Sequence, residues 1–119
     1  METEDVMEAT RDIHTDETLE CLSSLADRQR VRIVALLTQG EYCACELTEL
    51  LGVRQNTLSH HMKVLRDEQI VLTRKKPSDQ RWIYYRLNPQ KLRLLAELFG
   101  DWVSQVEARL PRDVKCPLD

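Results

Sequence analysis

Two cysteines that flank a single alanine, Cys43 and Cys45, are the side chains of this sequence best suited to bind a soft ion. Thiolates select thiophilic metals and metalloids over calcium or magnesium. The Cys-x-Cys spacing differs from the Cys-x-x-Cys spacing of zinc knuckles and thioredoxin-like redox sites, so a structural tetrahedral zinc site is not expected. Both cysteines fall at the start of a helix expected over residues 44–51, where free backbone amides and the helix dipole favour the thiolate.

The helical position of this pair predicts what ion binding would do. In a regular helix, residues two apart point about 200° away from each other, because each residue turns the helix by about 100°. Both sulfurs can therefore reach one ion only if the first turn is irregular or unwinds. We expect such binding to strain the start of this helix and the helix that packs against it. The alternative is that Cys43 and Cys45 are small apolar core residues, a common fate for free cysteine.

The segment 54–65 carries apolar residues at helical spacing on one side and polar residues on the other. Leu58, Met62 and Leu65 form the apolar side, and Gly52 supplies the turn after the preceding helix. A helix, a short turn with glycine and a second helix predict a helix-turn-helix. The expected DNA contacts are the outward polar residues of the second helix and the basic residues near it: Arg54, Gln55, Asn56, Ser59, His60, Lys63, Lys75, Lys76 and Arg81.

The net charge of −3 is distributed unevenly along the 119 residues. Residues 1–27 carry nine Asp and Glu against one Arg, whereas residues 54–93 carry ten Lys and Arg against three Asp and Glu. Local charge governs attraction to phosphate, so the mild acidity of the whole chain does not exclude a DNA partner. The alternative is an ordinary solvated charged face. His61, on the second helix of the motif, fits either a DNA contact or a partly buried structural histidine.

The periodicity along the chain predicts a mainly α fold with a small β-hairpin. Helices are expected over 15–26, 27–37, 44–51, 54–68 and 90–108, with Thr15 and Asp27 as N-caps of the first two. Strands over 70–74 and 82–87, joined by a basic loop, form a hairpin wing. This order is a winged helix-turn-helix of five helices plus a two-stranded wing. Residues 15–110 should form its single domain, between a flexible acidic arm (1–14) and a tail (111–119).

Apolar stripes along the helices predict the core and an interface. The inward residues are expected to be Leu19, Leu22 and Leu25 in the first helix, Val31, Val34 and Leu37 in the second, and Leu47, Leu50 and Leu51 in the third. The last helix carries a longer stripe than one small domain needs: Leu92, Leu95, Phe99, Trp102, Val103 and Val106. With the first helix, this stripe predicts a homodimer interface.

Composition limits the compartment and the role of the remaining thiols. Hydrophobic content of 42% and charged content of 31% are typical of a soluble globular protein, and no apolar run approaches the roughly 18 residues of a membrane span. The acidic N-terminus lacks the features of a signal peptide, so we expect a cytoplasmic protein without disulfides. Cys21 lies between leucines of the first helix and is either a packing residue or a further ligand. Cys116, in a proline-flanked tail, is either a free thiol or a mobile ligand.

Three segments resemble the ArsR/SmtB repressors: Gly-Glu-Tyr-Cys-Ala-Cys-Glu-Leu at 40–47, Leu-Ser-His-His-Met-Lys-Val-Leu-Arg at 58–66 and Trp-Ile-Tyr-Tyr-Arg-Leu at 82–87. These homodimeric winged helix-turn-helix proteins leave their operators when they bind a metal or metalloid. The Cys-x-Cys box is similar to that of the arsenic and antimony sensors and of the cadmium/lead sensors. The resemblance implies a repressor and not an enzyme. Its partners would be double-stranded operator DNA and a second copy of the chain, and its inducer trivalent arsenic or antimony, with cadmium, lead or zinc as alternatives.

The chain also departs from these sensors. Thr48 stands where enterobacterial arsenic sensors carry a third cysteine, residues 1–20 lack the arm cysteines of cadmium/lead sensors, and residues 90–108 lack the histidines of the zinc, cobalt and nickel sensors. The resemblance therefore implies a two-thiolate site at Cys43 and Cys45, with Cys21 and then Cys116 as candidates for a further ligand. A thiol-based redox or persulfide sensor on the same fold is the alternative. An ion-detoxifying enzyme would need acid–base partners that the sequence does not supply.

Overall fold

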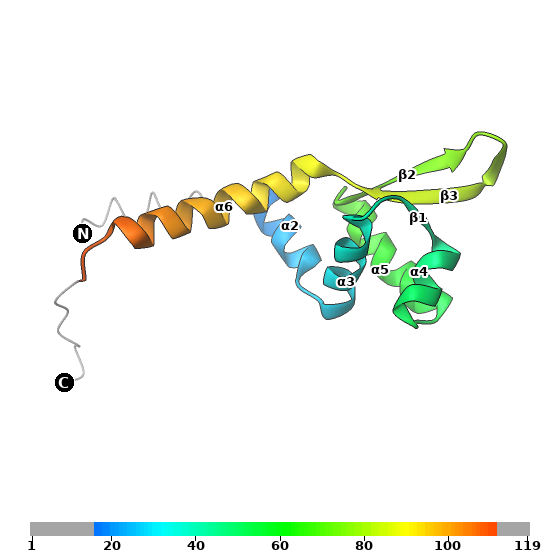
Figure 1. Ribbon diagram of the computed structural model, residues 1–119, viewed down its shortest axis with the longest axis horizontal. Coiled ribbons are helices and arrows are strands. Elements are labelled where there is room, and N and C mark those ends of the chain that lie inside the picture. The colour runs from blue at the N-terminus through cyan, green and yellow to red at the C-terminus, as the bar shows by residue number, and fades with distance from the viewer. Residues whose placement is uncertain (1–15, 112–119) are drawn as a thin grey trace.

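The computed structural model of the chain describes residues 16–111 and has the predicted winged helix-turn-helix architecture (Figure 1). Its elements are α2 (Asp16–Leu25), α3 (Arg28–Leu37), β1 (Tyr42–Cys43), α4 (Ala44–Leu51), α5 (Gln55–Asp67), β2 (Val71–Lys76), β3 (Asp79–Leu87) and α6 (Pro89–Ala108). All five predicted helices are confirmed. The expected arm (1–14), the Thr15 cap and all but the first residue of the expected tail, Cys116 included, lie outside the described residues.

The antiparallel sheet contains three strands in the order β1-β3-β2, where the sequence predicted two. In the added strand, Tyr42 pairs with Tyr85 and Cys43 pairs with Tyr84. A two-residue strand is too short to show an alternating pattern, and only its pairing with a distant segment defines it. The predicted two-stranded wing is confirmed as β2 and β3, whereas β1, which adds a third strand to the sheet and carries one of the candidate thiols, was not predicted.

The hairpin of β2 and β3 is longer than expected. The sequence predicted a loop over 75–80, but Lys76 still pairs with Asp79, so the turn consists of Pro77 and Ser78 alone. Pro and Ser are common turn residues, and pairing resumes at Lys76 after a register shift that leaves residues 80–82 of β3 without partners in β2. The wing thus extends away from the helical body, in the direction opposite to the outer part of α6 (Figure 1).

Local signals define where the helices begin and end. Asp27 caps α3, because its Oδ1 atom accepts hydrogen bonds from the backbone N–H of Gln29 at 2.9 Å and of Arg30 at 3.1 Å. Asn88 caps α6 in the same manner. Gly52 ends α4 with a φ of 67°, in the left-handed region that glycine adopts without a Cβ clash. This glycine makes the sharp turn between the two helices of the helix-turn-helix.

The core lies between α2, α3, α4, α5, the start of the wing and the inner part of α6. Its fully or nearly fully buried members include Cys21, Ile33, Leu37, Leu47, Leu58, Met62, Leu65, Ile70, Val71 and Leu95. Two predicted core residues are exposed instead, Leu50 by 55% and Val31 by 50%. The eight-residue α4 buries only Leu47 and Leu51, which lie one turn apart, and Ile33 takes the inward position that we had assigned to Val31.

The predicted stripe of α6 divides into two parts. Leu95 is buried against the body together with Leu98, which the prediction did not include, whereas Phe99, Trp102 and Val106 on the outer part are between 37% and 74% exposed. This outer part runs out past the rest of the helical body (Figure 1). Within residues 16–111, no helix is both long and apolar enough to cross a membrane.

Candidate thiolate site and nucleic-acid interface

The two candidate ligands lie at the junction of β1 and α4. Cys43 is the last residue of β1 and the N-cap of α4, and it is only 6% exposed. Cys45, two residues later in the first turn of α4, is exposed. The Oε1 atom of Glu46 accepts a hydrogen bond from the backbone N–H of Cys43 at 3.0 Å. That bond is the main reason why the pKa of Glu46 lies below its ordinary value. The junction is therefore an ordered helix start with one covered and one accessible thiol.

Residues Cys43 and Cys45 both contribute to the lining of an open groove of about 460 Å³ between the start of α4 and the wing. The lining residues are Cys43, Ala44, Cys45, Asp79, Arg81, Trp82, Ile83 and Tyr85. All five that face the cysteines come from β3, and Trp82 and Ile83 are exposed apolar side chains. The Arg81 guanidinium is held by both carboxylate oxygens of Asp79, each at 3.1 Å. The wing thus forms the second wall of the thiol groove.

A third ligand does not accompany the pair among the described residues. Residues 16–111 contain no group of three or more His, Cys, Asp or Glu side chains that could hold a metal ion. The hydroxyl of Thr48, at the position of the third cysteine in some arsenic sensors, donates to the backbone carbonyl of Cys45 at 2.8 Å. Of the three thiols within residues 16–111, two therefore lie beside the same groove.

Cys21 is separate from this groove. It lies in the core on α2 with 0% exposure, and its Sγ atom is 3.6 Å from the backbone carbonyl oxygen of Lys91 on α6. Burial raises the pKa of the Cys21 thiol, although the nearby Lys91 ammonium acts in the opposite direction. A buried thiol with a raised pKa is a poor source of thiolate, so these contacts favour the packing interpretation of Cys21.

The recognition helix α5 has the predicted division of faces. Its buried residues are Leu58, Met62 and Leu65. The polar residues assigned to DNA contacts, Gln55, Asn56, Ser59 and His60, are all exposed. They occupy the first two turns of the helix, the part that enters the major groove in helix-turn-helix proteins.

The basic candidates are divided between α5 and the wing. Arg54, at the N-cap position of α5, is exposed, and Lys63 forms an exposed ion pair within the helix at 2.7 Å. In the wing, Lys75 is exposed and the Lys76 ammonium lies 5.7 Å from the centre of the Trp82 ring. Exposed ion pairs contribute little free energy, so Lys63 can exchange its carboxylate for a phosphate at small cost.

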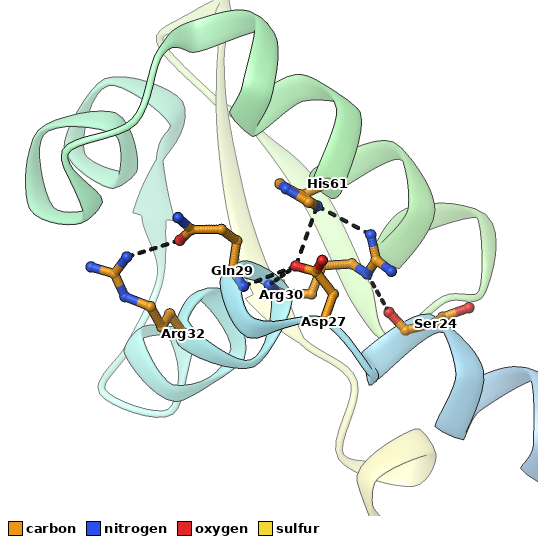
Figure 2. Close-up of polar contacts among 6 residues, drawn as sticks. All are labelled: Ser24, Asp27, Gln29, Arg30, Arg32 and His61. Atoms are coloured by element: carbon orange, nitrogen blue, oxygen red, sulfur yellow. Dashed lines mark hydrogen bonds and ion pairs between the residues drawn. The ribbon is translucent and has the colours of Figure 1, made fainter.

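The sequence left the role of His61 open, and the structure places this residue in a polar network with α2 and α3 (Figure 2). Its Nδ1 atom lies 3.1 Å from Nη1 of Arg30 and 3.8 Å from Oδ1 of Asp27. The Nε atom of Arg30 also donates to the backbone carbonyl of Ser24 at 2.6 Å. The sequence predicted the capping role of Asp27. The contact between Arg30 of α3 and His61 of α5 joins two helices and has no local sequence signal.

Comparison with known proteins supports the architecture and the motif. Residues 27–72, which span α3 to the start of β2, match the family model described as bacterial regulatory protein, arsR family. The arsenical resistance operon repressor of Staphylococcus aureus is 48% identical over 67 residues, which cover 56% of this chain and 62% of that protein. The arsenic resistance transcriptional regulator ArsR1 of Pseudomonas putida is 35% identical over 94 residues, covering 72% of this chain and 71% of that protein.

Solved structures agree with these matches. A crystal structure described as a possible transcriptional regulator for arsenical resistance is 32% identical, with a TM-score of 0.61 over 78% of this chain and 98% of that chain. The BigR transcriptional repressor of Xylella fastidiosa is 30% identical, with a TM-score of 0.58 over 84% of this chain and 95% of that chain. On its helix-turn-helix, its wing and these relatives, the chain belongs to the ArsR family, whose members are DNA-binding transcriptional repressors and not enzymes.

Proposed function

We propose that this protein is a homodimeric repressor that releases operator DNA when trivalent arsenic or antimony binds Cys43 and Cys45. The observation that carries this proposal is the placement of both thiols at one helix start, on one wall of a single groove. The names of several relatives, which are arsenical resistance repressors, support the choice of inducer.

The ligand set favours arsenic or antimony over zinc. Zinc in structural sites takes four protein ligands, whereas the described residues supply only two thiols here. Trivalent arsenic takes three sulfurs, so a site with two protein thiolates has one position left for a small cellular thiol. The groove is open to solvent and has room for such a ligand. Cys21 could take this position only if α2 left the core.

Ion binding at this place would act on both DNA-contacting elements. Cys43 is fixed by its pairing with Tyr84 of β3, and Cys45 is fixed in the first turn of α4. Cys43 has an extended backbone (φ −87°, ψ 169°) and precedes the helix, so the divergence expected for two helical residues does not apply to this pair. Coordination by both sulfurs would instead pull directly on the junction of β1 and α4. The strained elements are in direct contact with the wing and with α5, since α4 packs against α5. The arrangement of the protein that binds the ion and the arrangement of α5 and the wing that binds DNA would therefore exclude each other.

The DNA surface in this proposal consists of the exposed start of α5 and the basic wing. Its residues are Arg54, Gln55, Asn56, Ser59, His60, Lys63, Lys75, Lys76 and Arg81. Asn and Gln can form paired hydrogen bonds with adenine, and the basic residues suit phosphate contacts. Arg81 and Asp79 belong to both the groove and the wing, so an occupant of the groove lies next to a phosphate-contacting side chain.

The outer part of α6 supports the dimer. Phe99 and Trp102 form an edge-to-face pair with ring centres 5.6 Å apart, yet both remain exposed in the single chain. Val103 and Val106 extend this apolar face along the helix. A second copy that covers the face would place two recognition helices at a fixed separation, as two half-sites about one DNA turn apart require.

The test compares Cys43→Ser and Cys45→Ser with Cys21→Ala as the matched control. DNA that the wild-type protein selects from a random duplex library is labelled, and its release is followed by fluorescence anisotropy as trivalent arsenic is added under reducing conditions. We expect all three variants to bind this DNA and only the control to release it. Normal release by either serine variant would refute the site. Release by peroxide or persulfide, without any response to arsenic, would identify the protein as a redox sensor instead.

A further inference from the structure

Two polar contacts accompany the apolar packing of the recognition helix: His61 on its inner side faces Arg30 of α3, and Glu68 at its C-terminal cap forms an ion pair with Lys91 of α6 at 3.6 Å. The His61 side chain is only 14% exposed, and its Nδ1 atom faces the Arg30 guanidinium at 3.1 Å (Figure 2). A guanidinium can only donate, so this contact is a hydrogen bond in which Nδ1 is the acceptor. The other inward residues of α5 are apolar, and their packing has no preferred direction. The contact of His61 with Arg30 therefore restricts the rotation and sliding of α5 in a way that the core does not.

Arg30 is itself held at both ends. Its backbone N–H donates to Oδ1 of Asp27 at 3.1 Å, and its Nε atom donates to the carbonyl oxygen of Ser24 at 2.6 Å. The backbone hydrogen bond from Arg30 is the main reason why the pKa of Asp27 lies below its ordinary value. The carboxylate thus stays charged beside Arg30 and His61. One arginine side chain therefore connects the end of α2, the start of α3 and the inner face of α5.

Side-chain contacts also join α2 to α6. The Lys91 ammonium of α6 lies 3.1 Å from the Glu17 carboxylate of α2, and the buried Cys21 thiol of α2 contacts the backbone of Lys91. Arg30 donates to Ser24 of α2, and α2 in turn contacts α6, the helix proposed to form the dimer. On the DNA side, the ring of the exposed His60 lies 5.3 Å from the ring of His61. A shift of His61 would move the DNA-facing residues beside it.

From this geometry we propose that Arg30 and His61 are positioning residues that set the angle of α5 against the α2–α6 unit. In the dimer they fix the separation of the two recognition helices, and so the half-site spacing that the repressor accepts. This inference rests on the proposed dimeric repressor but not on the identity of its inducer. Neither residue needs to touch DNA or the ion for this role.

The experiment compares His61→Leu with His61→Asn, whose amide oxygen can accept a hydrogen bond near the position of Nδ1. A second pair is Arg30→Met and Arg30→Lys. Each protein is titrated with the duplex that the wild type selects and with the same duplex carrying five extra base pairs between its half-sites. Five base pairs turn one half-site to the opposite face of the DNA, because one turn contains about 10 base pairs.

We expect wild type and His61→Asn to prefer the selected duplex strongly, with affinities within about twofold of each other. His61→Leu and Arg30→Met should lose about tenfold in affinity for the selected duplex and little for the spaced one. A general loss of stability would instead lower Tm and leave the preference for correct spacing unchanged at a temperature well below Tm. Arg30→Met keeps the apolar packing of α5, so it remains informative if His61→Leu fails to fold.

Two results would overturn the inference: unchanged spacing preference in both apolar variants, or equal losses in His61→Leu and His61→Asn. These results are distinct from a failure of the proposed inducer. If arsenic never releases the wild-type protein but the apolar variants lose spacing preference, the positioning role stands and the inducer is wrong. A wild-type protein that binds both duplexes equally would refute the positioning role together with the dimer.

Discussion

Cys43 pairs with Tyr84 across strands β1 and β3, so the proposed ion ligand and the wing belong to one sheet. The first element to respond to a movement of Cys43 is therefore the wing strand, which carries Trp82 and Arg81 on the other wall of the groove. The thiol also begins α4, the first helix of the helix-turn-helix. The proposed ligand at this junction would thus act on both elements that flank it, the wing and α4.

Trp82 should report directly on occupation of the groove. The chain has two tryptophans, and Trp102 lies on α6 away from the groove, so Trp102→Phe leaves a single reporter. Addition of trivalent arsenic to this variant should change the intensity of its emission, because the environment of the indole changes. The Trp82→Phe protein should show no such change. An unaltered Trp82 spectrum at saturating arsenic would contradict the placement of the ion in this groove.

The three thiols within residues 16–111 should react with iodoacetamide in a fixed order. Cys45 is exposed and should be modified first, Cys43 is 6% exposed and should follow slowly, and Cys21 is fully buried with a raised pKa and should react only after unfolding. Peptide mass spectrometry at successive times measures all three rates. Arsenic bound beforehand should protect Cys45 and Cys43 equally. Rapid modification of Cys21 in the folded protein would show that α2 opens from the core.

Trp102→Glu should convert the dimer to a monomer. A carboxylate in the middle of the apolar face of α6 would be buried without a partner on association, at a cost of several kcal/mol. Sedimentation velocity at micromolar concentration measures the change in mass. The control is Val31→Glu, on an apolar residue of α3 that is 50% exposed, and it should remain dimeric. A Trp102→Glu protein that sediments like the wild type would place the dimer interface elsewhere.

The glycines Gly52 and Gly100 should respond oppositely to alanine. Gly52 has a φ of 67°, so Gly52→Ala should destabilise the protein by about 1 kcal/mol although no atom lies within 4 Å of the new Cβ. Gly100 lies inside α6 with equally open space, so Gly100→Ala should stabilise the helix by about 0.5–1 kcal/mol. Denaturant unfolding of both variants provides the comparison. Changes of the same sign would contradict the assigned turn.

Asp27 should make stability depend on pH in the acidic range. Its folded pKa is lowered, first by the backbone hydrogen bond from Arg30, so its contribution is complete above the ordinary aspartate pKa and is lost as the pH falls through the folded value. Asp27→Ala should therefore lower Tm by about 5 °C at neutral pH, and by progressively less below about pH 4. The control is Glu49→Ala, on the exposed side of α4. Its difference in Tm from the wild type should not shrink as the pH falls.

Local sequence signals predicted most of the fold, because the helix ends depend on residues such as Asp27 and Gly52 that act on their neighbours. The strand at Tyr42–Cys43 was missed because its only support is a pairing with residues some forty positions later. The same reason applies to the contact of Arg30 with His61. The Cys-x-Cys pair was identifiable from spacing, but the wall of the groove opposite it depends on where the wing folds back.

The unequal exposure of Cys43 and Cys45 affects the rate at which the protein would respond to its inducer. In the proposed mechanism, a metalloid arriving from solution would meet Cys45 first, at a rate proportional to its concentration, because Cys43 is covered. Closure onto Cys43 is then a first-order step, and its rate depends on how often the junction of β1 and α4 opens. At high metalloid concentration the rate of this opening would be the upper limit on the rate at which the protein releases its operator. The speed of derepression is then determined by a local unfolding rate of the protein and not by its affinity for the inducer.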